Sequence, residues 1–298
     1  MLTYIIGYAK ERFFLKQLIV NADDFGLHTH VNHGIYDGHK NGIITSTSLM
    51  PTGLAFEHAV SIAHETPSLG IGIHLTLVGE TTVLDASKIP SLVDKDGRLP
   101  VQYPQFLLHY GLGKIQAKDV AKELFAQVKK VMNTGVSVTH LDSHQHMHIV
   151  PGVIDIVIAL AKEFKIPAIR IPAEPYSFTG NYPASLARIM GRCGLTFLAE
   201  QARKKIIKSG LYTTQNFFGM VAGGNMQEMY LSEILKNLPN GTSEVMMHPG
   251  EGEDELSKSY SWGYHWKSEL AATKSNSIKE CITSSHIQLI SFHDLSTK

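Results

Sequence analysis

Short apolar runs alternate with segments of helical spacing along most of this chain. A run that is apolar throughout suits a strand buried on both faces, and a helix between two such strands provides the crossover that parallel strands need. The pattern therefore predicts a parallel sheet covered by helices on both faces. The expected strands lie at residues 17–21, 43–50, 70–77, 137–141, 168–171, 244–247 and 288–291.

About seven strand–helix repeats fit a TIM-like (β/α) barrel, complete or incomplete, better than an open doubly wound sheet. No Pro/Gly/Ser-rich linker or internal repeat divides the chain, so we expect a single barrel domain over residues 18–298 after an N-terminal extension at residues 1–17. In both architectures, catalytic residues gather at the carboxyl ends of the strands. The expected helices lie at residues 31–41, 53–65, 116–133, 151–164, 183–193, 227–237 and 261–276.

Charge and cysteine content exclude several classes of protein. The 27 Lys and Arg residues balance 27 Asp and Glu residues, which leaves no global field for a nucleic-acid backbone. The two cysteines, Cys193 and Cys281, have no C-x-x-C spacing, which excludes a cysteine-only zinc site and a disulfide framework. No run reaches the ~18 apolar residues of a membrane span. We therefore expect a soluble, cytoplasmic protein that binds no nucleic acid, with a homodimer left open.

Two adjacent carboxylates, Asp23 and Asp24, follow the first expected strand. One of them could simply cap the next turn, as Asp often does. Neighbours in a regular strand point to opposite faces, however, and one of the two would then be driven into the core. Past the end of the strand both can converge on one cation, with one carboxylate binding it and the other handling protons.

Histidines mark two further strand ends. His74 lies inside the third apolar run, where a hydrogen-bonded core histidine is the simpler interpretation. One carboxylate and imidazoles from two strand ends would suit a divalent metal that keeps open positions for water and substrate. A chelate made by the last three histidines of the next strand end would instead leave the Asp pair and His74 without a role. Four His and one Asp occur there within nine residues, at positions His140, Asp142, His144, His146 and His148.

Two more polar residues interrupt apolar runs. His248 ends the strand at 244–247 before Pro249 and Gly250; it could stabilise that turn or act as a general acid near neutral pH. Arg170 could pair with a buried acid, hold a carboxylate or orient the substrate.

Four motifs carry a family resemblance over residues 18–289. The chain resembles the YdjC-like carbohydrate deacetylases, which include chitooligosaccharide deacetylases. The resemblance implies a TIM-barrel-like fold and metal-dependent removal of acetyl groups from N-acetylated sugars. It also implies that Asp24, His74 and His144 bind the metal and that Asp23 is the base. The motifs are NADDFG at 21–26, GIHLTL at 72–77, THLDSHQHMH at 139–148 and MMHPG at 246–250.

A narrower resemblance concerns the substrate. Residues 88–99 and 170–175 look like the hopanoid-biosynthesis-associated branch, which implies an N-acetylglucosaminyl hopanoid lipid as substrate. In the expected reaction, His248 or a histidine of the 146–148 pair protonates the sugar nitrogen. Arg170, His146 and His148 are the candidate substrate contacts.

The identity of the metal and the class of activity have alternatives. The resemblance favours Mg²⁺, ligand softness favours Zn²⁺, and Mn²⁺, Co²⁺ or Ni²⁺ would also fit. The competing functions are another metal-dependent hydrolase, such as a phosphoesterase or amidohydrolase, and a non-catalytic metal-containing sugar-binding protein.

Two segments after the main motifs suggest contacts with a ligand. Four aromatic residues alternate at positions 260, 262, 264 and 266, which fits either core packing or a platform for a sugar ring. Residues 216–226 are rich in Phe, Met and Gly, a composition that suggests a mobile lid.

Overall fold

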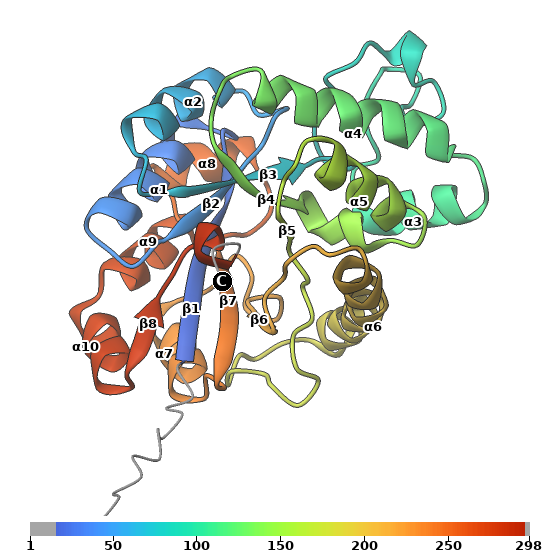
Figure 1. The fold of residues 1–298 in the computed structure, drawn as a ribbon. Helices are drawn as coiled ribbons and strands as arrows, with labels where there is room; N and C mark the ends of the chain where they lie inside the picture. Colours follow the sequence, from blue (N-terminus) through green and yellow to red (C-terminus); the bar gives the residue numbers. More distant parts are fainter. Residues whose placement is uncertain (1–15, 296–298) are drawn as a thin grey trace, which may run out of the picture.

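The computed structural model describes residues 16–295, and the strands in this range form one curled parallel sheet (Figure 1). Seven strands follow the order β5-β4-β3-β2-β1-β7-β6, and β8 pairs with the start of β1. Tyr212 makes a parallel bridge to Ala168 of β5. The predicted incomplete (β/α) barrel is thus confirmed. The strands are β1 (Lys16–Phe25), β2 (Ser46–Leu49), β3 (Gly70–Leu75), β4 (Val138–Ser143), β5 (Ala168–Ile169), β6 (Asn216–Phe218), β7 (Gly241–Met247) and β8 (Ile287–Leu289).

Helices surround the sheet on several sides in Figure 1. The amphipathic pattern is clear in α4, where Val120, Leu124, Val128 and Val131 are buried at spacings of three and four residues. Burial of each such side chain contributes about 1.5–3 kcal/mol. The helices are α1 (Thr29–Lys40), α2 (Phe56–Glu65), α3 (Tyr103–Gly111), α4 (Ala117–Met132), α5 (Val153–Glu163), α6 (Leu186–Lys208), α7 (Glu228–Lys236), α8 (Glu253–Ser259), α9 (Trp266–Lys274) and α10 (Asn276–Ser284), with short 3₁₀ helices η1 (Ala86–Lys88), η2 (His144–Ile149) and η3 (Phe292–Leu295).

Strand β1 is the centre of the sheet. It pairs with β7 along one edge, and with β8 and then β2 along the other. Every residue of β1 after Lys16 is buried, as expected for a central strand that has neighbours on both edges and is covered on both faces. Lys16 and Gln17, the last residues of the expected N-terminal extension, belong to this strand, whereas residues 1–15 lie outside the described part of the chain.

Several helices differ from the expectation, and α8 has no counterpart among the predicted elements. Helix α6 continues to Lys208 instead of ending at residue 193. The helix expected at 261–276 is replaced by a turn and then by α9 and α10, which meet at Ser275, whose side chain caps α10 by accepting from the backbone N–H of Ile278. Helix α3 has no counterpart in the predicted elements.

The segment expected to be a mobile lid is held in place. Its first residues form strand β6, which pairs with β7. The Glu174 carboxylate then accepts hydrogen bonds from the backbone N–H groups of Gly219, Met220 and Val221 at 2.8–3.2 Å. This buried acceptor fixes the turn after β6, which composition alone could not reveal.

Among the residues that the structure describes, no helix combines the length and the apolar character needed to cross a bilayer.

Candidate metal centre

The end of β1 is irregular, and this irregularity brings two neighbouring carboxylates to one place. The register with β2 shifts between Ala22 and Phe25, and Asp24 has a φ of +66°. A regular strand would send Asp23 and Asp24 to opposite faces. Here both lie near His74, since each belongs to a cluster of candidate ligand atoms that includes this histidine.

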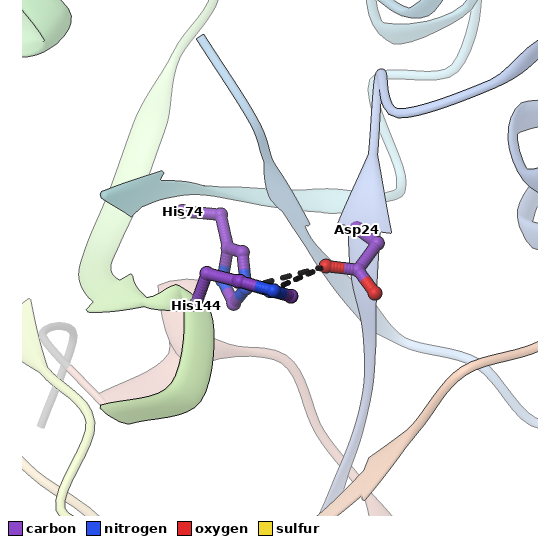
Figure 2. A group of neighbouring side chains, drawn as sticks. All are labelled: Asp24, His74 and His144. Atoms are coloured by element: carbon purple, nitrogen blue, oxygen red, sulfur yellow. Dashed lines mark ion pairs between the residues drawn. The ribbon is translucent and has the colours of Figure 1, made fainter. Parts of the chain in front are cut away.

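Asp24, His74 and His144 point toward one another from β1, β3 and the start of η2 (Figure 2). Asp24 Oδ1 lies 3.2 Å from His144 Nδ1 and 3.5 Å from His74 Nε2. One ligand atom from each residue lies within 4.8 Å of the others, and all three side chains are buried. The three strand ends therefore meet as the sequence predicted, whereas no placement of a metal follows from this distance alone.

The Asp24 carboxylate lacks the hydrogen bonds that a buried acid ordinarily accepts. Neither oxygen has a partner with hydrogen-bond geometry, although the residue is only 1 % exposed. Burial by itself would raise the pKa of Asp24, but the nearby imidazoles of His144, His248 and His74 outweigh burial and lower it, so the carboxylate is ionised. An ionised, buried and unbonded carboxylate beside two imidazole nitrogens is a donor set that fits a divalent cation.

A second carboxylate orients His74. Its Nδ1 lies 2.9 Å from Asp142 Oδ1, which leaves Nε2 facing Asp24. Burial by itself lowers the pKa of His74. The charge and the hydrogen bond of Asp142, together with the charges of Asp23 and Asp24, outweigh burial and raise the pKa to about 9. A carboxylate behind an imidazole is the usual outer support of a metal-binding histidine. Asp142 belongs to the histidine-rich segment, and its spacing of two from His140 and His144 was the signal that could have identified it.

Asp23 has the opposite surroundings. Arg170 donates two parallel hydrogen bonds of 2.7 Å to this carboxylate, from Nη1 to Oδ2 and from Nη2 to Oδ1. Asn21 donates a further hydrogen bond of 2.9 Å to Oδ1. Each carboxylate oxygen can accept two bonds, so Oδ2 keeps one acceptor position. Asp23 lines a cleft of about 210 Å³ together with His74 and His144.

Arg170 is fully buried, and each of its three side-chain nitrogens contacts a carboxylate. Besides Asp23, it pairs through Nη1 with Asp142 and through Nε with Glu244, each at 2.7 Å. Of the interpretations considered for Arg170, the geometry therefore supports pairing with buried acids. It does not support contact with the substrate. Sequence reasoning missed Glu244; burial raises its pKa to about 8, since the lowering effect of Arg170 is smaller.

The remaining histidines of the rich segment divide into two groups. His148 Nδ1 lies 2.7 Å from Ser143 Oγ and its Nε2 lies 3.0 Å from the carbonyl oxygen of Arg170. His140 stacks on Phe292 with ring centroids 3.7 Å apart. Burial lowers the pKa of His148 to about 4 and that of His140 to about 3, so both are neutral core residues. The substrate contact expected of His148 has no support in this geometry, because both of its ring nitrogens are engaged.

His146 and His248 do line the cleft. The Nδ1 atom of each is buried and has no hydrogen-bond partner. Buried polar atoms without a partner are rare in native proteins, and here two of them belong to residues that line the same cleft. The backbone is unusual here too, because His146 and its neighbour Gln145 have φ values of +61° and +51°. Such strained residues cluster at functional sites.

The alternating aromatic residues form one wall of the site. Trp262 lies 5.3 Å from the His144 ring and Tyr264 lies 4.7 Å from the His248 ring, measured between centroids. Both residues line a second cleft that shares His144 and His146 with the first. Trp266 instead packs into the core. The core-packing interpretation is thus confirmed for Trp266, whereas the sugar platform stays a prediction for Trp262 and Tyr264. Tyr103 and Arg188 also line both clefts, and nothing in the sequence distinguished them.

Comparison with known proteins agrees with this geometry. Residues 17–284 match the family described as YdjC-like protein. A carbohydrate deacetylase of Thermoanaerobacter pseudethanolicus is 33% identical over 86% of this chain and 89% of its own length. A carbohydrate deacetylase of Brevibacillus brevis is 30% identical over 94% of this chain and 99% of its own. A crystal structure from Enterococcus faecalis, provisionally named a cellobiose-phosphate cleavage protein, superimposes with a TM-score of 0.75 at 26% identity, covering 94% of this chain and 99% of the other. The chain belongs to the YdjC-like protein family.

Proposed function

We propose that this chain is a divalent-metal-dependent hydrolase that removes the acetyl group from an N-acetylated sugar. The single observation that carries the proposal is the buried Asp24 carboxylate, whose oxygens have no hydrogen-bond partner and face two imidazoles. The names of the related carbohydrate deacetylases supply the reaction and the class of substrate.

Asp24, His74 and His144 would hold the ion. A divalent cation bound there lowers the pKa of a coordinated water and balances negative charge on the carbonyl oxygen of the amide. One carboxylate and two imidazoles suit Zn²⁺, Mn²⁺, Co²⁺ or Ni²⁺, and they suit Mg²⁺ if waters complete its shell. Family resemblance supports Mg²⁺, whereas the nitrogen ligands support Zn²⁺.

Asp23 would act as the general base. Its Oδ2 keeps one free acceptor position toward the cleft, while Arg170 fixes the plane of the carboxylate with two bonds. A base held in this way need not reorient before it accepts the proton of the attacking water. Arg170 is thus a positioning residue, and it also holds Asp142 behind His74.

His248 would donate the proton that the departing sugar nitrogen needs. It lines the same cleft as Asp23 and packs against Tyr264. The Glu269 carboxylate accepts a hydrogen bond from its backbone N–H, which fixes the start of the turn after β7. His146, with its own unpartnered Nδ1, is the alternative donor or a contact for the sugar.

The wall of the cleft favours a substrate with an exposed ring face. Trp262 and Tyr264 offer the apolar surface against which a pyranose can pack. A chitooligosaccharide and an N-acetylglucosaminyl hopanoid both satisfy this requirement.

The single-domain division at residue 18, the cytoplasmic location and the homodimer stay predictions.

A direct test measures acetate release from N-acetylglucosamine, chitobiose and an acetylglucosaminyl hopanoid. The metal is first removed by chelation, and each divalent ion is then added back separately. We expect release from at least one acetylated sugar only when an ion is present. Full activity after exhaustive chelation would contradict the metal role, and phosphate release from phosphate esters without acetate release would indicate a phosphoesterase.

A further inference from the structure

Helix α6 has an unusual distribution of polarity in its first half. Its buried side includes Arg192 and Thr196, whereas Leu186, Met190 and Phe197 are 73, 65 and 59 % exposed. A helix that only packs on its own domain shows the reverse arrangement. The exposed apolar residues of this helix therefore call for an explanation outside the fold.

The exposed residues form a straight stripe along α6. At 3.6 residues per turn, positions 186, 190, 197, 204 and 208 fall within about 20° of one line on the helix surface. The stripe is apolar in its first half and ends with the exposed residues Lys204 and Lys208. Four of the twelve exposed large apolar side chains of the described residues belong to this one helix, namely Leu186, Met190, Phe197 and Ile207.

The charge of α6 is far from that of the whole chain. The helix contains six Lys and Arg residues and one Glu, a formal charge of +5, in a chain whose formal net charge is zero. Arg192 is buried, Arg203 pairs with Glu200 and Lys205 pairs with Asp155, so the exposed positive charge that faces solvent along the stripe is that of Lys204 and Lys208. Such a local excess attracts an anionic surface. A basic and apolar exposed face together is the combination found on helices that lie in a membrane interface.

We propose that the exposed stripe of α6 docks this protein on an anionic lipid surface. Lys204 and Lys208 would contact the headgroups, while Met190 and Phe197 would reach the boundary with the acyl chains. A second copy of the chain fits less well, because a two-fold contact sets the same surface against itself and would oppose two helices of like charge.

Docking would have a consequence for the active-site cleft. Ala187, Arg188, Gly191 and Leu195 of the same helix line the cleft, between the stripe residues in sequence. Tyr103 reaches toward α6 at Gly191 from the other side. A lipid surface against the stripe would therefore lie beside this wall of the cleft.

Flotation of the full chain with phosphatidylcholine vesicles, with and without phosphatidylglycerol, tests the proposal without reference to the reaction. We expect binding only to the anionic vesicles, weakened by salt. Each lysine at such a surface contributes about fivefold in affinity, so K204E/K208E should weaken binding by at least about 25-fold. M190Q/F197Q should weaken it by about tenfold or more, since it removes apolar burial.

The matched control is L54Q/K118E, which changes one exposed apolar residue and one exposed lysine away from α6. It should bind like the unchanged chain, and all three variants should keep the same melting temperature and hydrolysis of a soluble acetylated sugar. The proposal is overturned if the chain ignores anionic vesicles, if the control loses as much binding, or if M190Q/F197Q binds normally. Dissociation of a dimer by the α6 variants, without vesicle binding, would assign the stripe to a second copy instead. A chain that docks but releases no acetate would contradict the proposed function alone.

Discussion

Asp23 and Asp24 are neighbours with the same chemistry, and the structure gives them opposite surroundings. Asp23 is held by a buried arginine and an asparagine, whereas Asp24 has no hydrogen bond and faces two imidazoles. The residues around Asp23 and Arg170, behind the site, form a network of hydrogen bonds and ion pairs. The atoms of Asp24 in front of it have no hydrogen-bond partner and are free to bind a ligand. Residue type therefore does not assign a role here; the supply of hydrogen-bond donors does.

The network behind the site contains more negative than positive groups. Arg170 alone faces Asp23, Asp142 and Glu244. Burial of three carboxylates with one guanidinium favours a proton on the weakest acid, and the pKa of Glu244 is accordingly raised to about 8. Near neutral pH the network thus keeps Asp142 ionised and Glu244 neutral.

The largest expected effect separates the two carboxylates. Asp24→Asn should abolish both metal retention and turnover, because it removes the anionic ligand; Asn tolerates the positive φ of this position. Asp23→Asn is the matched control, since it should keep the metal but lose about 10²–10⁴-fold in kcat as a missing general base. Metal content of the purified variants and acetate release decide. If Asp23→Asn lost the metal and Asp24→Asn kept it, the two roles would be exchanged.

A smaller effect on metal binding is expected from replacing Asp142, which connects the two regions. Asp142 contacts His74 in front and Arg170 behind. Asp142→Asn should weaken metal affinity by about 10–100-fold, as loss of an outer carboxylate behind a ligating histidine does. Competition with a chelating dye measures the affinity. Ser48→Ala is a useful companion, because it removes the 2.6 Å hydrogen bond to Asp142 Oδ2, together with the Ser48 contacts to Asn21 and His140, but leaves the Asp142 carboxylate in place, so it should have a smaller effect. Unchanged affinity in Asp142→Asn would separate the network from the metal centre.

The smallest effect concerns stability at alkaline pH. Burial raises the pKa of Glu244 from 4.5 to about 8, so the folded state favours the neutral form. The stability linked to this proton is complete below pH 4.5 and is lost as pH rises toward 8. Glu244→Gln keeps a neutral acceptor for Arg170 and cannot ionise, so between about pH 4.5 and pH 8 its melting temperature should fall less, or rise more, than that of the unchanged chain. Parallel thermal melts across this range, at fixed ionic strength, would show the difference; equal slopes would mean that Glu244 is already ionised near neutral pH.

The fold was largely predictable because apolar runs and helical spacing are local signals. The strands around β1, β3, β4 and β7 and the amphipathic α4 all lie close to the expected positions. The errors fell where long-range contacts decide. Residues 216–218 joined the sheet because β7 offered them an edge, and Glu174 fixed the turn that follows. The composition of residues 216–226 cannot predict either contact, because β7 and Glu174 lie elsewhere in the sequence.

The sequence by itself determined the succession of strands and helices, the candidate ligands at the strand ends and the family motifs, since each depends on spacing along the chain. Only the tertiary structure decided which polar residues have partners. It placed Arg170 and His148 behind the site, left Nδ1 of His146 and His248 unpartnered in the cleft, and exposed the apolar stripe of α6. The physical reason is that hydrogen bonding and burial depend on groups far apart in the chain, and a neighbour in space has no fixed distance in sequence.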